Sequence, residues 1–456
     1  MPLLWAANII VCELLLVRAF IAACRWPHIS RHDWMWIPWR WVPSEVHMLV
    51  IADPQLTDEY SYEQEPGLLL ALTELFSDIY MKRNFRLIQQ LMRPQFVMFA
   101  GDMMDGGREW KDAAFNRELK RLGDVFQRLD SSTVTVGVPG NHDIGFGDNV
   151  INYAYERYLL NFGRLNSVFD IGEHFVILLD TVSLSSIRQT PASKRARDFM
   201  DSYELPPQRL AGRTILLTHV PLYRPGDVDC GPRRRSPPIA NRAGYQYQNL
   251  IQPALTQEIL KKFRPDIIIS GDDHDDCVYS HVIGNHTVVE HTIGTFSWLQ
   301  GNPYPSFGVM SLRPTFAEPL SPLSPTFELK VCSLPPQMYI YFWYIALLVF
   351  SILWIARSSI ISPYHFEPVS ATDPDDVEIG AAGVSSSLSL LQQHKQPGRP
   401  LRRPRSRPAL RRTCFLIDGG FWSAFFRGLA LMVLPNLAIY IGFLLFYYKP
   451  NFSLYY

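Results

Sequence analysis

Residues 140–143 (Gly-Asn-His-Asp) closely follow a β-branched run over residues 133–136, which predicts a buried strand. The glycine permits an open turn, the asparagine offers a neutral oxygen ligand, and the imidazole of His142 can carry a proton. Hydrolysis of a phosphoester by two metal ions needs such groups side by side. Gly, Asn and Asp are also common turn residues, so the tetrapeptide alone fits an ordinary turn equally well.

Four more apolar runs end abruptly in side chains that bind metals. The clusters at their ends are Asp53-Pro54-Gln55, Gly101-Asp102, Thr218-His219 and Gly271-Asp272-Asp273-His274. In open α/β folds, ligands gather outside the carboxyl ends of the strands. We therefore expect the five strand ends to converge on one crevice.

The elements that must position these clusters alternate between strand and helix. Apolar residues recur at helical spacing over 67–92 and again over 110–129, each time between two of the predicted strands. This order is typical of βαβ units and predicts a parallel or mixed sheet that is covered on both faces. Further along, we expect a helix over 247–263, edge strands over 281–293 and a proline-rich stalk over 303–325.

The chain of 456 residues has 43 basic and 43 acidic side chains, so its net charge gives no reason to expect a nucleic-acid partner. Three stretches approach the ~20 apolar residues that a membrane-spanning helix needs. The predicted organisation is an N-terminal transmembrane anchor (1–24), a lumenal domain (45–320), a transmembrane helix (338–357), a disordered basic loop (358–420) and a transmembrane helix (428–447). The first stretch contains Glu13 and Arg18, which are costly in lipid. A cleaved signal peptide competes with the anchor, but no basic region precedes the stretch.

Seven arginines between residues 398 and 412 place the basic loop in the cytosol by the positive-inside rule. The domain before it then faces a lumen, and so do the glycosylation acceptors Asn285 and Asn451. Three arginines after the first span, within residues 25–40, favour the opposite orientation, with that flank in the cytosol. We give the tighter cluster more weight.

The six cysteines show no CxxC spacing, which argues against a cysteine zinc site. Cys230 and Cys277 each follow a predicted ligand cluster, and in an oxidising lumen they are candidates to pair. Cys12, Cys24 and Cys414 lie in or beside the apolar stretches and are expected to be inert.

Taken in order, the five clusters resemble the motifs of the calcineurin-like metallophosphoesterase superfamily. The resemblance covers residues 45–300 and implies an α/β/β/α sandwich. More narrowly, residues 51–56 (Ile-Ala-Asp-Pro-Gln-Leu), the paired Asp272-Asp273 and the membrane anchors resemble the fungal form of certain phosphodiesterases of the endoplasmic reticulum. These enzymes remove ethanolamine phosphate from GPI-anchor glycans.

The resemblance also implies a role for each residue. One divalent ion would be held by Asp53, Gln55, Asp102 and His274, and the other by Asp102, Asn141, His219 and Asp272. His142 would act on the leaving oxygen, and Asp143 would orient its imidazole. Superfamily members usually carry His where Gln55 and Asp272 stand; the additional carboxylate favours manganese, with iron and zinc as alternatives.

The expected function is a dimetal phosphodiesterase, multi-pass in the endoplasmic-reticulum or early Golgi membrane, whose partners are GPI-anchored proteins or GPI lipid. A phosphatase for another lipid-linked or nucleotide phosphate is an alternative, and so is a non-catalytic membrane adaptor or cargo receptor with a degenerate metal site. Gln55, which stands where superfamily members usually carry His, is the residue that suggests this non-catalytic alternative. The loop residue Arg224 is expected either to contact a substrate phosphate or to be solvated, and Asp105 and Asp273 are expected to be turn residues.

Overall fold

The computed structural model describes residues 1–29, 45–62, 67–205, 212–313, 326–361 and 419–448. Most of the predicted basic loop, including its arginine cluster, lies outside the described residues, and so does Asn451. The chain divides into two compact units: one contains residues 1–5 and 343–438, and the other contains residues 6–342 and 439–456. The second unit carries every predicted ligand cluster.

Two mixed β-sheets form the centre of this unit. The first has the order β13-β12-β1-β2-β3. Its strands are β1 (Val46–Ile51), β2 (Phe96–Phe99), β3 (Val134–Gly137), β12 (Ser306–Leu312) and β13 (Phe327–Ser333). The second has the order β10-β11-β9-β6-β5-β4. Its strands are β4 (Ser167–Ile171), β5 (His174–Leu178), β6 (Thr214–Leu217), β9 (Ile267–Ser270), β10 (Cys277–Ile283) and β11 (His286–Thr292).

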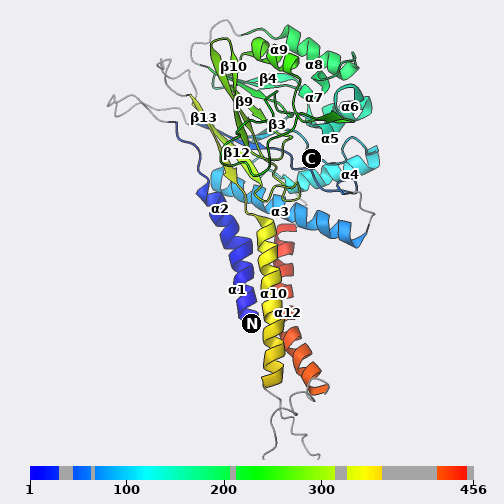
Figure 1. The fold of residues 1–456 in the computed structure, drawn as a ribbon, viewed down its shortest axis with the longest axis vertical. Helices are drawn as coiled ribbons and strands as arrows, with labels where there is room; N and C mark the ends of the chain where they lie inside the picture. Colours follow the sequence, from blue (N-terminus) through cyan, green and yellow to red (C-terminus); the bar gives the residue numbers. More distant parts are fainter. Residues whose placement is uncertain (30–44, 63–66, 206–211, 314–325, 362–418, 449–456) are drawn as a thin grey trace, which may run out of the picture. The chain divides into compact units, whose positions relative to one another are not determined.

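The two sheets pack face to face and are covered by helices on their outer faces, so four layers follow one another in Figure 1. In β1, Met48 and Val50 belong to the core between the sheets, whereas Leu49 and Ile51 belong to the core under the helices. This alternation follows from the two-residue period of a strand. The helices on the first sheet are α3 (Leu68–Met92) and α4 (Asp112–Val125); those on the second are α8 (Pro191–Ser202) and α9 (Pro253–Phe263). The predicted α/β/β/α sandwich is thereby confirmed.

Short elements carry or adjoin the candidate site. They are α5 (Asn141–Ile144), the 3₁₀ turn η2 (Gly147–Asn149), α6 (Asn152–Phe162), α7 (Thr181–Leu184) and the hairpin β7 (Ala243–Gly244) and β8 (Tyr247–Gln248). β1, β2 and β3 are parallel neighbours, as are β5, β6 and β9. Their carboxyl ends therefore meet at one edge of the sandwich.

Three sequence predictions about the fold are wrong. β3 is an edge strand and is not buried, since Val134 is 44% exposed. The predicted stalk over 303–325 contains β12, a fully buried strand between β1 and β13. The helix predicted from residue 247 begins only at Pro253, because residues 247–248 form β8.

Both disulfides tie distant segments of the unit together. Cys230 pairs with Cys277, which confirms the predicted bond. Cys24 pairs with Cys332 on β13 across 308 residues of sequence, so Cys24 is not the inert residue that the sequence suggested. This second disulfide attaches the end of the first apolar helix to the first sheet.

Three apolar helices are long enough to cross a membrane: Pro2–Ala23, Gln337–Ile360 and Phe421–Phe446. The first is divided into α1 (Pro2–Ile10), a π-helical segment η1 (Val11–Leu16) and α2 (Val17–Ala23). The other two lie in α10 (Gln337–Ile361) and α12 (Gly419–Tyr448).

Glu13, the acidic residue in the first apolar helix, forms an ion pair with Arg83 of α3. Both side chains are buried, and Arg83 also donates a hydrogen bond to Oε1 of Gln337 at 3.0 Å. Val17 and Ile21, on the next turns, are completely buried in the domain core. The second half of the apolar helix is therefore built into the second unit, and the costly charge at Glu13 is neutralised there.

We expect Arg83→Met to lower the free energy of unfolding by about 3–5 kcal/mol, because it leaves Glu13 buried without a partner. Urea-induced unfolding of the detergent-solubilised full chain, followed by tryptophan fluorescence, measures this change. The double variant Glu13→Leu/Arg83→Met removes both charges and should recover most of the loss. Arg117→Met is the control, because this α4 arginine is 71% exposed and its ion pair contributes about 0–1 kcal/mol. Equal losses in the single and double variants would contradict the role of the pair.

Candidate metal centre

The predicted ligands share an unusual backbone conformation at the strand ends. Nine non-glycine residues within the described part of the chain have positive φ. Five of the nine are predicted metal ligands: Asp53 (46°), Gln55 (37°), Asp102 (48°), Asp272 (64°) and His274 (59°). Such left-handed residues cost free energy and concentrate at functional sites. Here they turn the chain sharply at the end of each strand, so that the side chains face one another.

Two glycines allow the close approach of these turns. A Cβ at Gly140 would lie 1.9 Å from Oδ1 of Asp102, and a Cβ at Gly101 would lie 2.3 Å from Nδ1 of His219. Gly101 also has a φ of +96°. The glycines of the two motifs are therefore required where the loops after β2, β3 and β6 meet.

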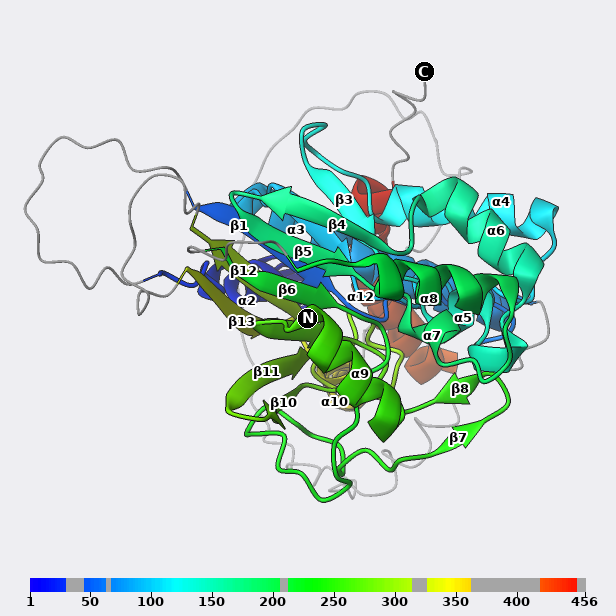
Figure 2. The same cartoon turned by 90° about the horizontal axis from the view of Figure 1, so that it is seen from above.

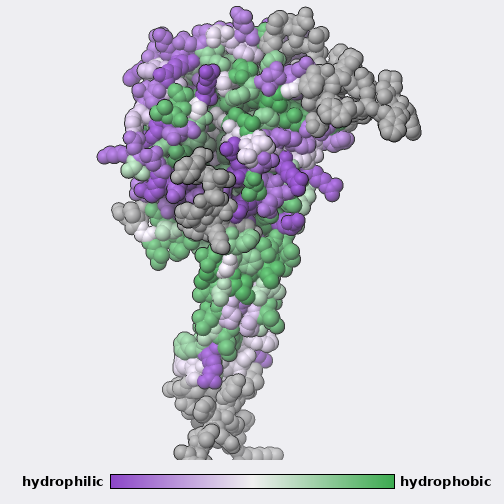
Figure 3. Space-filling view, turned by 180° about the vertical axis from the view of Figure 1, so that it is seen from behind, coloured by the Kyte–Doolittle hydropathy of each residue, from purple (hydrophilic) through white to green (hydrophobic). Residues whose placement is uncertain are grey.

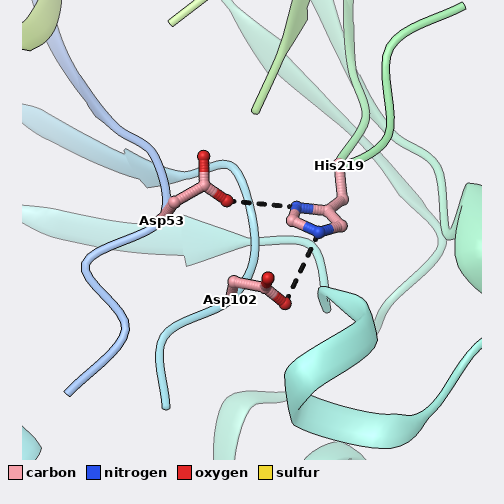
Figure 4. Close-up of side chains that lie close together, drawn as sticks. All are labelled: Asp53, Asp102 and His219. Atoms are coloured by element: carbon pink, nitrogen blue, oxygen red, sulfur yellow. Dashed lines mark ion pairs between the residues drawn. The ribbon is translucent and has the colours of Figure 1, made fainter. Parts of the chain in front are cut away.

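His219, which follows β6, lies at the centre of the cluster. Figure 4 shows Asp53 and Asp102 on either side of its ring, each from the end of a different strand. Nδ1 lies 2.7 Å from the carbonyl oxygen of Ala100, so it donates its proton there in the neutral tautomer. Nε2 faces Oδ1 of Asn141 at 3.2 Å, and Oδ1 of Asp102 and Oδ1 of Asp272, both at 3.4 Å. Burial opposes a charge on the ring, but Asp102 and Asp272 prevail and raise the pKa of His219, so a metal ion at Nε2 would replace a proton there. Fixing one ring nitrogen on a carbonyl while the other faces oxygen ligands is how proteins prepare a histidine for a metal.

Asp53, Asp102 and His219 each offer one ligand atom within 4.8 Å of the others, which is a spacing that one ion can bridge. Both carboxylate oxygens of Asp53 accept the backbone N–H of Asp272, at 3.1 and 2.9 Å. Gln55 donates its amide N–H to Oδ2 of Asp102 at 2.9 Å. The structure thus brings six of the predicted ligands into direct contact, and the buried imidazole of His274 lies close enough to interact electrostatically with Asp102, Asp272 and His219.

The amide of Asn141 has its orientation fixed from the other side. Its Nδ2 donates to the carbonyl oxygen of Gln246 at 3.2 Å, which leaves Oδ1 facing His219. Gln246 precedes β8, and Figure 2 shows the β7–β8 hairpin on the same side of the unit as α5, where Asn141 lies. The hairpin therefore presents the asparagine oxygen, a ligand atom, toward the cluster.

The pKa directions indicate a site built for a cation. Burial is the largest influence on both aspartates: it raises the pKa of Asp53 well above the ordinary range, although His219 opposes this. For Asp102 the opposing attraction of His219 and His142 prevails, and the pKa is lowered. Burial lowers the pKa of His274 despite Asp272 and Asp102, which favours the neutral ring that a metal ligand needs. Buried carboxylates at this spacing fit divalent cations, which neutralise their charge.

His142 lies beside the cluster, and its imidazole is held by Asp105. Nδ1 lies 2.8 Å from Oδ1 of Asp105. Burial opposes protonation of the ring, but Asp102 and Asp105 prevail and raise the pKa of His142 to about 9. The ring is therefore a proton donor at neutral pH.

The prediction that Asp143 orients this imidazole is wrong. The carboxylate of Asp143 accepts the backbone N–H groups of Gly140, Met103 and Met104 instead. Burial raises its pKa to about 7. Asp143 thus connects the loops after β2 and β3. Asp105, expected to be a turn residue, orients the imidazole of His142 instead.

Arg224 is neither solvated nor available to contact a substrate phosphate. Its side chain is 1% exposed and forms an ion pair with Asp273 at 2.5 Å. Arg234 donates to the same carboxylate at 2.6 and 3.0 Å. Asp273 stands between two predicted ligands, so this clamp fixes the loop that carries them. Sequence analysis missed both roles, because neither arginine is near Asp273 in sequence.

The sequence profile of the calcineurin-like phosphoesterase family matches residues 46–276 of this chain, a range that contains all the clusters described above. The chain belongs to this family. It is 33% identical over 399 residues to Cell division control protein 1 of Saccharomyces cerevisiae, covering 85% of this chain and 79% of that protein. It is 28% identical over 374 residues to Metallophosphoesterase 1 of Gallus gallus, covering 77% and 85%, and 22% identical over 354 residues to the Drosophila melanogaster homologue, covering 74% and 87%.

This calcineurin-like phosphoesterase is a metal-dependent phosphoester hydrolase, as the family and its relatives indicate. The family uses a dimetal site, and the cluster around His219 has the donor atoms for one. Its three long apolar helices associate it with a membrane. The assignment of individual residues to each ion stays a prediction.

Proposed function

We propose that this phosphoesterase removes ethanolamine phosphate from GPI-anchor glycans in the lumen of the endoplasmic reticulum or early Golgi. The observation that carries the proposal is the joining of a membrane helix to the catalytic unit through the Glu13–Arg83 pair and the Cys24–Cys332 disulfide. An active site tethered in this way meets lipid-anchored substrates at a high effective concentration. The motif over residues 51–56, which resembles that of the GPI-glycan phosphodiesterases, gives further support.

Two disulfides support a lumenal catalytic unit, since such bonds persist in oxidising compartments. Cys24 comes directly after the first apolar helix, so the bond fixes the side of the membrane on which that helix ends. Asn285, the acceptor within the described residues, is exposed in the turn between β10 and β11, where a glycan fits.

In the proposed site, the two ligand sets that the sequence predicted would each hold one ion and would share Asp102. One ion is assigned to Asp53, Gln55, Asp102 and His274, and the other to Asp102, Asn141, His219 and Asp272. When bound, divalent ions activate water and stabilise the charge on the phosphoryl oxygens. Mixed carboxylate, amide and imidazole donors without thiolate favour manganese, with iron or zinc as alternatives.

The chain's own part in the reaction centres on His142. Its protonated ring donates to the leaving oxygen as the P–O bond breaks, and Asp105 holds the ring in place. Asp102 accepts the backbone N–H of His142 at 2.9 Å, so the proton donor is fixed to the bridging carboxylate. Gln55, hydrogen-bonded to Asp102, orients that carboxylate as well.

Mass analysis of GPI glycans tests the substrate. Cells that lack the gene receive either the wild-type chain or His142→Ala, with comparable amounts of protein verified. We expect glycans one phosphoethanolamine heavier to accumulate only with the variant. Matching profiles would overturn the GPI assignment while leaving the family intact, and the alternative would then be hydrolysis of another lipid-linked or nucleotide phosphate.

A further inference from the structure

The long helix α3 carries a largely apolar face from Leu68 to Tyr80, which Arg83 continues by one more turn. Leu68, Leu69, Leu72, Phe76, Tyr80 and Arg83 fall within about 120° of one another at 100° per residue. The opposite side of the helix is polar where it meets α4, since the buried carboxylate of Asp78 accepts hydrogen bonds from Arg121 at 2.6 and 2.8 Å. The apolar face is therefore turned away from α4.

The second half of this face is covered by the membrane helices. Arg83 meets Glu13 and Gln337, and the hydroxyl of Tyr80 donates to the carbonyl oxygen of Pro335 at 2.8 Å. The rings of Phe76 and Tyr341 lie 6.4 Å apart, edge to face. Tyr341 is already about 6 Å, or four residues, inside the second candidate span. Phe76 of α3 therefore lies at the depth at which that span enters the bilayer.

Among the described residues, none gives the first half of the face such a cover. Leu68, Leu69 and Leu72 are 78%, 69% and 40% exposed, and we name these three residues the α3 apolar patch. Leu68 lies about 12 Å along the helix from Phe76. In Figure 1, α3 crosses α2 instead of running parallel to it, so this distance extends sideways from the membrane helix. Figure 3 shows apolar side chains gathered at the lower edge of the domain, over the first turns of α3.

We propose that the α3 apolar patch inserts into the surface of the lipid bilayer and fixes the orientation of the catalytic unit on the membrane. The occupant is lipid because the patch continues, on the same helix face, the surface that already contacts both membrane helices. Interfacial helices bury such a face about 5–10 Å deep, which suits leucine side chains at the level of Phe76. A docked unit holds the candidate metal site at one fixed distance from the membrane, so phosphoesters linked to lipid are favoured over soluble ones. The proposal rests on membrane attachment and hydrolysis, and not on the identity of the GPI substrate.

The direct test measures lipid contact in the full-length protein in vesicles of phosphatidylcholine. Leu69→Cys, labelled with the fluorophore NBD in a Cys12→Ser/Cys414→Ser background, reports on the patch. Phe350→Cys is the lipid-facing control in α10, and Leu160→Cys, 85% exposed on α6, is the aqueous control. Brominated phosphatidylcholine should quench NBD at residue 69 as it does at residue 350, whereas iodide should quench only residue 160.

Two results would overturn the proposal. If residue 69 behaves like residue 160, the patch lies in water. If NBD at residue 69 is protected from both iodide and brominated lipid, a protein and not the bilayer covers the patch.

A functional comparison separates docking from folding. The triple variant Leu68→Ser/Leu69→Ser/Leu72→Ser should lower kcat/KM at least about tenfold for a phosphodiester attached to a lipid, because the candidate metal site no longer has a fixed distance from the membrane. Its kcat/KM for soluble bis(p-nitrophenyl) phosphate should stay unchanged. The control Leu160→Ser/Ile187→Ser changes exposed residues elsewhere and should leave both rates unaltered. Equal rates of the triple variant and the wild type on the lipid substrate would contradict the docking.

Discussion

Replacing Asp102 by Asn is expected to lower kcat at least about 10³-fold, because the predicted bridging ligand loses its charge and metal binding weakens. Asn has nearly the same shape as Asp, so the turn after β2 should survive. The change also removes the negative charge that faces Nε2 of His219 at 3.4 Å, whereas the amide oxygen of Asn can still accept the His142 backbone N–H. Both the metal content and the activity should therefore fall together.

Metal content per chain, measured by plasma mass spectrometry on the purified full-length protein, is the first readout, and hydrolysis of bis(p-nitrophenyl) phosphate is the second. Asp180→Asn is the matched control, since Asp180 is equally buried but caps α7 through Ser183, a role that Asn also fills. A normal metal content in Asp102→Asn would contradict the role of Asp102 as a shared ligand.

The second large effect is expected for His142→Ala, and its size should depend on the leaving group. A proton donor contributes about 10²–10⁴-fold when the leaving oxygen is an alkoxide. p-Nitrophenolate is stable without a proton, so its release should slow by less than about tenfold. The measurement compares kcat for bis(p-nitrophenyl) phosphate with kcat for a diester that has an alkyl leaving group.

Asp105→Asn serves as the companion variant for this comparison, because it keeps the shape of the residue beside Nδ1 and removes the charge that stabilises the imidazolium. It should show the same dependence on the leaving group in a weaker form. An equal loss on both substrates by His142→Ala would show that the histidine positions substrate or metal and does not donate a proton.

The strand ends that carry the site could be predicted because each combines an apolar run with an abrupt change to metal-binding side chains. β1, β2, β6 and β9 follow this pattern, and their carboxyl ends do meet. The pattern failed for β12, where both faces are covered and serine and glycine interrupt the apolar residues, so no alternation marks the strand. It also overstated the burial of β3, because sequence does not reveal that this strand is the last in its sheet.

The error over Asp143 has a simple geometric cause. Asp143 follows His142 directly in the helix α5, and consecutive helical residues point about 100° apart, so their side chains do not meet. Asp105 comes from a different loop, and its approach depends on the turn after β2. In the same way, no local signal connects Cys24 with Cys332 or Asp273 with its two arginines, because these contacts arise only when the sheets have assembled.

The left-handed backbone at five predicted ligands means that these strand ends destabilise the fold whenever no ion is bound. Each such residue costs of the order of 1–2 kcal/mol relative to an ordinary conformation, and the clustered carboxylates repel one another. An ion that binds only the folded chain offsets this cost in proportion to its free concentration. The supply of metal should therefore set how long the protein survives in its compartment, as well as how fast it works.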